Sequence, residues 1–160
     1  MAPLVMLLAV TAAAMVYGMV GDPRFRSPAE ALRIGLAAMF AMTGIAHFVG
    51  MREELVAMVP PGLPAPELLV TVTGVLELVG AVALLDRRTA RWSAAALGAL
   101  LVVMFPANVH LALTGTDVGW TQELVPRTVL QIVFLAATVV VARGVRSRPA
   151  PGADTRSRVA

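Results

Sequence analysis

The chain has 160 residues, of which 58% are hydrophobic and only 14% charged, and its mean hydropathy is +0.80. A soluble domain of this length is nearer half apolar and a quarter charged, so the composition excludes an ordinary soluble protein and predicts an integral membrane protein. The absence of cysteine excludes disulfides, thiol nucleophiles and thiolate-bound iron–sulfur clusters, and the net charge of +3 comes from arginine alone.

Five apolar segments of about 17 to 24 residues follow one another, and this is the length that a membrane-spanning helix needs. They cover residues 4–20, 31–49, 67–85, 90–113 and 124–142. The sequence therefore predicts an all-α transmembrane domain over residues 1–146. The remaining segment, 147–160, is rich in Arg, Pro, Ser and Gly, which is typical of a disordered tail.

The first two segments differ in their boundaries. The first resembles a signal peptide in length, but Arg24 and Arg26 follow its apolar run where a signal peptide has basic residues before it. We therefore expect it to stay as a helix. The second segment opens with Ser27 as a candidate N-cap, Pro28 at the first helical position and Glu30 three residues after the cap.

The connection of residues 51–67 joins the second and third segments. Residues 52–58 combine Glu53 and Glu54 with apolar Leu55, Val56 and Met58, which predicts a short amphipathic helix at the membrane interface. Four prolines then stiffen the chain up to the third segment. The connection is interpreted either as a lid over a pocket mouth or as a simple spacer.

The arginines predict the orientation. Eleven of the thirteen fall on one side if all five segments cross the membrane, and only Arg52 and Arg127 fall on the other. The positive-inside rule makes the arginine-rich side cytoplasmic, with the N-terminus outside and the C-terminal tail inside a bacterial plasma membrane. This pattern also explains the sequence pI of about 11.0 without nucleic acid as a partner.

Glu77 is the most informative residue, because it lies in the middle of the third apolar segment. Ten residues separate it from Glu67, which is ~15 Å along a helix and reaches the midplane of a ~30 Å hydrocarbon core. A carboxylate there is costly unless it faces protein or water, so a ligand or proton site is the default interpretation. The alternative is a carboxyl group that only joins helices. Thr73 lies one turn away on the same face.

Other polar residues gather near the predicted outer ends of the helices. His47, Asn108 and Gln131 come from three different segments, and with Glu77 they are predicted to ring one outward-facing pocket. Arg127 precedes Gln131 by one turn and is expected either to clamp a ligand or to snorkel to lipid phosphates. His47 and His110 as haem or metal ligands is a weaker interpretation, and no metal site is predicted. The side to which His110 points stays open.

Several of these pieces together resemble the DoxX-like family of small membrane proteins. The matching pieces, in order, are residues 44–48 (GIAHF), 58–64 (MVPPGLP), 74–81 (GVLELVGA) and 105–108 (FPAN), followed by Gln131. The resemblance implies a four-helix transmembrane bundle of the second to fifth segments, with the first segment as an extra N-terminal helix. One branch of that family is similar to the membrane subunit of a thiosulfate:quinone oxidoreductase.

These observations leave three functions open, and whether the chain is itself catalytic is open with them. The first is the quinone-binding membrane subunit of a redox complex, which needs a partner protein to supply electrons. The second is a binding or transport protein for a small solute. The third is an assembly or chaperone subunit whose polar residues only pair helices. The lipid bilayer is a partner in each case, and a homo-oligomer is compatible with all three.

Overall fold

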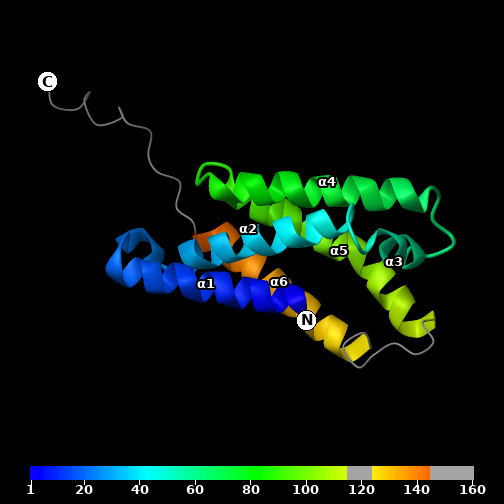
Figure 1. The fold of residues 1–160 in the computed structure, drawn as a ribbon, viewed down its shortest axis with the longest axis horizontal. Helices are drawn as coiled ribbons and strands as arrows, with labels where there is room; N and C mark the ends of the chain where they lie inside the picture. The colour runs from blue at the N-terminus through cyan, green and yellow to red at the C-terminus, as the bar shows by residue number, and fades with distance from the viewer. Residues whose placement is uncertain (115–123, 145–160) are drawn as a thin grey trace, which may run out of the picture.

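The computed structural model describes residues 1–114 and 124–144, and all regular secondary structure in these ranges is helical. Five helices are long and apolar enough to cross a membrane, which confirms the predicted all-α membrane fold. They are α1 (Ala2–Val20), α2 (Pro28–Ala46), α4 (Pro66–Leu85), α5 (Ala90–Thr114) and α6 (Leu124–Gly144), as Figure 1 shows. Short helices η1 (Pro23–Arg26) and α3 (Arg52–Ala57) lie in the connections. The predicted tail, 147–160, lies outside the described residues.

Four of the long helices form a closed bundle. Helix α2 packs against α4, α4 against α5, α5 against α6, and α6 returns to α2. Helix α1 packs mainly against α2, on the outside of this ring (Figure 1). The structure therefore confirms a bundle of the second to fifth long helices with one extra N-terminal helix. At the α1–α2 crossing, a Cβ on Gly35 would collide with the Thr11 hydroxyl and the Leu7 carbonyl, so a glycine is needed there.

Helix α2 is the centre of the molecule. In its most apolar stretch 56% of the residues are buried, against 11–28% in the other long helices. Leu36, Met39 and Phe40 of this helix are fully buried in the core. Helices α4, α5 and α6 contribute four alanines to the same core, beside Leu84, Leu97 and Val141. Small partners let the helices approach closely, which is how transmembrane helices gain van der Waals contact without a hydrophobic driving force.

The ends of α2 follow local sequence signals. Ser27 is the N-cap and Pro28 begins the helix, as predicted, but the Ser27 hydroxyl makes no capping hydrogen bond. The predicted C-terminal end is wrong by three residues, because α2 ends at Ala46 and His47 is its C-cap. A turn follows in which Gly50 has φ of +81°, a left-handed conformation that other residues rarely adopt.

Because α2 ends early, it does not run the full length of α4. Its C-cap lies beside Gly74, eight residues after the start of α4, which is ~12 Å along that helix. Helix α3, predicted as the short amphipathic helix, packs against this first part of α4. The proline-rich connection then ends at Ala65, the N-cap of α4, which has a left-handed φ of +50°.

The bundle is tightly packed at one end only. All buried residues of α5 lie between Ala90 and Gly98, and no residue of α6 before Gln131 is buried. Figure 1 shows the α5–α6 pair diverging from α4 toward the end of the molecule where α3 lies. The predicted outer half of the bundle is therefore much less closely packed within the chain than the inner half.

Candidate functional site

The buried pair of His47 and Glu77 joins α2 to the middle of α4. The two side chains are 3% and 4% exposed, and His47 Nδ1 lies 3.8 Å from Glu77 Oε2. His47 Nδ1 is 2.9 Å from the carbonyl oxygen of Thr43. Because a carbonyl only accepts, Nδ1 carries the hydrogen and Nε2 is the acceptor in the neutral ring. Glu77 Oε2 has no hydrogen-bond partner among the described residues.

Two glycines allow this pair to form. A Cβ on Gly74 would lie 2.5 Å from His47 Cβ, and a Cβ on Gly44 would lie 3.2 Å from Glu77 Cβ and 2.9 Å from the Leu78 side chain. Both contacts are closer than the ~3.5–4.0 Å optimum for carbon atoms. The glycines at 44 and 74 therefore bring the backbones of α2 and α4 close enough for the imidazole and the carboxyl group to meet between them.

Arg52, the first residue of α3, forms hydrogen bonds to the same region. Its guanidinium donates to the carbonyl of His47 at 3.3 Å and to the Thr71 hydroxyl at 3.1 Å. A cation at the C-terminal end of α2 also suits the helix dipole. Sequence reasoning treated Arg52 only as an exception to the positive-inside pattern, and that exception was the signal that it has a structural partner.

The Thr73 hydroxyl group forms its hydrogen bonds within α4 and not with Glu77. It donates to the carbonyls of Leu69 and Val70, at 2.9 and 3.1 Å. Thr43 of α2 is, together with His47, a polar neighbour of the Glu77 carboxyl group. Thr73 thus lies one turn from Glu77 on α4, as expected, but its hydroxyl group bonds to its own helix, and Thr43 approaches the carboxyl group from α2.

Asn108, Arg127 and Gln131 link α5 to α6. Arg127 Nη1 donates to Asn108 Oδ1 at 2.5 Å, and Gln131 Nε2 donates to the carbonyl of Leu101 at 2.8 Å. Pro106 lies inside α5 and has no N–H, so this stretch of the helix has incomplete internal hydrogen bonding. Gln131 therefore donates to a backbone carbonyl in the turn that precedes Pro106. His110 is half-buried on the same part of α5.

The predicted site thus divides into two groups. His47 and Glu77 lie between α2 and α4, and Asn108, Arg127 and Gln131 lie between α5 and α6. The described contacts stay within each helix pair: His47 contacts Glu77, Arg127 bonds to Asn108, and Gln131 bonds to the α5 backbone at Leu101. The α5–α6 pair diverges from α4 in Figure 1, so we treat the two groups as separate walls. Among the described residues, no three His, Cys, Asp or Glu side chains gather where they could hold a metal ion.

A third polar cluster, at the opposite end of the bundle, was missed by the sequence analysis. Glu30 and Arg33 are both 5% exposed, and their side chains meet at 3.1 Å. Arg87 donates to the other Glu30 oxygen at 2.5 Å. Arg33 also donates to the carbonyls of Leu84 and Leu85, at 2.5 and 2.7 Å, and so caps the C-terminal end of α4.

This cluster explains why the predicted capping box is absent. The Glu30 carboxylate is engaged by two arginines and is not available to the backbone at Ser27. The only sequence signal was the spacing of Glu30 and Arg33, which are three residues apart and therefore share a helix face. The distant contribution of Arg87 has no signal in the sequence.

Comparison with known protein families gives one match, to a domain of unknown function (DUF8561), over residues 36–143. This chain belongs to that family. No curated protein and no solved structure matches it. The DUF8561 region begins inside α2 and ends at the last turn of α6, so it covers most of the four-helix bundle. It includes all six predicted site residues and leaves out α1, Glu30 and Arg33.

Proposed function

We propose that this protein is a DoxX-like membrane subunit that binds a small, partly apolar ligand with hydrogen-bonding oxygens, such as the headgroup of a quinone. The observation that carries the proposal is the unpartnered Glu77 Oε2. Whether it holds a proton or not, this atom is a buried donor or acceptor without a partner, which costs ~1–3 kcal/mol. A polar ligand atom that reaches it removes this cost.

The packing of the bundle supports a location for the ligand. The outer half of the α5–α6 pair has almost no buried residues, and it carries Asn108, Arg127 and Gln131. The α2–α4 pair carries His47 and Glu77 as the facing wall. A ligand bound between the two walls would supply the packing contacts that the outer half of the bundle lacks. Because α2 ends at Ala46, α3 and the proline-rich connection would cover the end of this ligand site.

Quinone chemistry suits these groups. A quinone has two carbonyl oxygens that accept hydrogen bonds, and its reduction adds two protons and two electrons. Carboxyl and imidazole groups can hold and pass protons, and amide and guanidinium groups can donate to carbonyls. The chain has no cysteine to hold an iron–sulfur cluster through thiolates. We propose that a separate redox protein supplies the electrons.

The test is the affinity of the purified protein in nanodiscs for a short-chain quinone, measured by calorimetry. We expect Glu77→Gln and Glu77→Leu to bind the quinone at least about tenfold more weakly, a loss of ~1.4 kcal/mol that matches an unsatisfied buried polar group. Glu67→Gln is the matched control, because Glu67 is an exposed carboxylate in the first turn of the same helix.

A double-mutant cycle then examines the two walls. His47→Ala and Glu77→Gln should be non-additive by ~0.5–3 kcal/mol in quinone affinity, since the two side chains are in contact. If the bound quinone touches both walls, Glu77→Gln and Gln131→Ala should also couple, but only when the quinone is present. No measurable quinone binding by the wild-type protein would refute the proposal.

A specific observation favours assembly as the second candidate function. Arg52, Arg127 and Gln131 each make a hydrogen bond to another helix, as a bundle that only needs stable packing would require. On this hypothesis Glu77→Leu leaves partner binding and stability nearly unchanged or improves them. Solute transport is the third candidate, and uptake of the same solute by proteoliposomes would distinguish it.

A further inference from the structure

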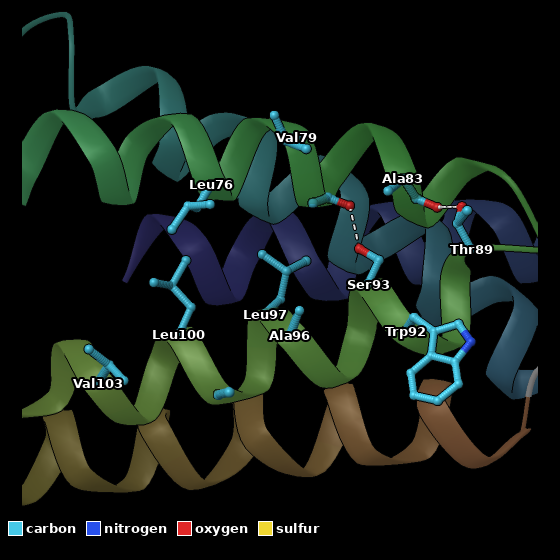
Figure 2. A pocket seen from close by; sticks show the side chains of 12 residues that line it. Leu76, Val79, Ala83, Thr89, Trp92, Ser93, Ala96, Leu97, Leu100 and Val103 are labelled. Carbon is cyan, nitrogen blue, oxygen red and sulfur yellow. Dashed lines mark hydrogen bonds between the residues drawn. The ribbon is translucent and has the colours of Figure 1, made fainter.

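A groove of about 630 Å³ runs along the outside of the bundle between α4 and α5 (Figure 2). It is lined almost wholly by apolar side chains, and Val79, Trp92 and Val103 at its borders are strongly exposed. The groove therefore opens away from the protein interior. None of the six predicted site residues lines it, so it is independent of the site proposed above.

The groove exists because α4 and α5 touch closely at one place and separate beyond it. The Ser93 hydroxyl donates to the carbonyl of Gly80 at 2.7 Å, and a Cβ on Gly80 would lie 2.6 Å from the Leu97 side chain. From this contact toward Leu76 and Leu100 the helices carry larger side chains across a wider gap, as Figure 2 shows.

The length of the groove matches one leaflet of a membrane. Its lining on α5 runs from Trp92 to Val103, two residues separated by eleven helical steps, which is ~16 Å along the helix. The hydrocarbon core of a bilayer is ~30 Å thick, so one leaflet contributes ~15 Å. A single acyl chain of a phospholipid therefore extends from one end of the groove to the other.

The end of the groove near Trp92 carries positive charge. Arg88 and Arg91 are both exposed there, and the Arg91 guanidinium lies 5.6 Å from the centre of the Trp92 ring, which is 71% exposed. Asp86 is the acidic residue nearby, and it accepts the backbone N–H of Arg88. These two arginines and the one aspartate together carry a net charge of +1.

We propose that the α4–α5 groove binds one anionic phospholipid, with an acyl chain along the apolar lining and the phosphate beside Arg88 and Arg91. Basic residues at the ends of transmembrane helices attract anionic headgroups, and tryptophan favours the headgroup region. A second copy of the chain is a less suitable occupant, because two such basic ends would meet if the copies lay parallel.

The experiment uses native mass spectrometry of the full chain released from nanodiscs of equal parts phosphatidylglycerol and phosphatidylcholine. We expect the wild-type protein to retain one phospholipid, with about a fivefold preference for phosphatidylglycerol, as a net charge of +1 near the headgroup predicts. Arg88→Gln with Arg91→Gln should abolish this preference. Arg24→Gln with Arg143→Gln is the matched control, because it removes two exposed arginines of the same predicted side from other places.

A second pair of variants tests the acyl chain. Ala96→Phe fills the groove and should reduce the retained phospholipid at least about fivefold. Ala13→Phe places the same side chain on an exposed position of α1, away from this groove, and should leave retention unchanged. Circular dichroism checks that both variants fold, and the arginine variants decide the question if Ala96→Phe does not.

Three results would overturn the proposal. The first is equal retention of the two phospholipids by the wild-type protein. The second is an unchanged preference in the arginine variant. The third is a dimer in the mass spectrum that Ala96→Phe dissociates, since the groove would then hold a second copy of the chain. None of these results depends on quinone binding, so the two proposals succeed or fail separately.

Discussion

Replacement of Arg33 by glutamine is expected to destabilise the fold strongly. Arg33 donates one hydrogen bond to Glu30 and two to the last carbonyls of α4, all at 3.1 Å or less, and it is 5% exposed. Breaking a buried ion pair by removing one partner costs ~3–5 kcal/mol. Because Arg87 still neutralises Glu30 in the variant, we expect the lower end, a loss of ~3 kcal/mol in the free energy of unfolding.

The assay is unfolding by sodium dodecyl sulfate in mixed micelles, followed by the helical circular dichroism signal. Arg24→Gln is the matched control, because it removes an arginine that also pairs with a carboxylate, Asp22, but at the exposed surface. Such pairs contribute ~0–1 kcal/mol. Equal stability of the Arg33 and Arg24 variants would refute the reasoning, since the buried cluster would then contribute no more than a surface pair.

Three further predictions concern packing, ionisation and topology. A Cβ on Gly74 would lie 2.5 Å from His47, so we expect Gly74→Val to lower the free energy of unfolding by ~1–3 kcal/mol. Gly62→Ala is the control, because a Cβ there meets no atom within 4 Å, and it should cost less than ~0.5 kcal/mol. Similar losses in the two variants would contradict a close α2–α4 contact. Hydrogen bonds from Arg24 lower the pKa of Asp22 from 3.8 to about 2. The ionised Asp22 therefore stabilises the fold above pH 3.8, and this contribution is lost as the pH falls through about 2. An NMR titration of Asp22 should show a midpoint at about 2, and Arg24→Gln should return this midpoint toward 3.8. Reporter fusions placed after each of the five long helices should alternate between the two sides of the membrane, and two successive fusions on one side would contradict the topology.

The fold was largely predictable because membranes simplify the problem. In a bilayer the backbone must satisfy its own hydrogen bonds, so every apolar run of sufficient length has to become a helix. The helix starts at Pro66, Ala90 and Leu124 were predicted within one residue. The end of α2 was not, because Phe48 and Val49 continue its apolar pattern, and the turn there depends on the packing of His47 against Gly74.

The sequence could select the polar residues of the candidate site, but it could not indicate how they contact one another. Glu77 and His47 could be selected because polar residues are costly inside a membrane. Their pairing with each other, and the separate pairing of Asn108 with Arg127, depend on how far α5 and α6 diverge from the other helices. That divergence follows from side-chain packing along whole helices, which a pattern of polar positions does not encode. The buried role of Arg33 was hidden for the same reason, since its partners on α4 are about fifty residues away.

The peripheral position of α1 has a practical consequence for protein engineering. A chain with five crossing helices has its ends on opposite sides of the membrane, whereas the ring of α2, α4, α5 and α6 alone would have both ends on the same side. Removing α1 would expose the face of α2 around Gly35 but would leave the ring contacts in place. A shortened chain could therefore carry two fused domains in one compartment, held next to each other by the bundle.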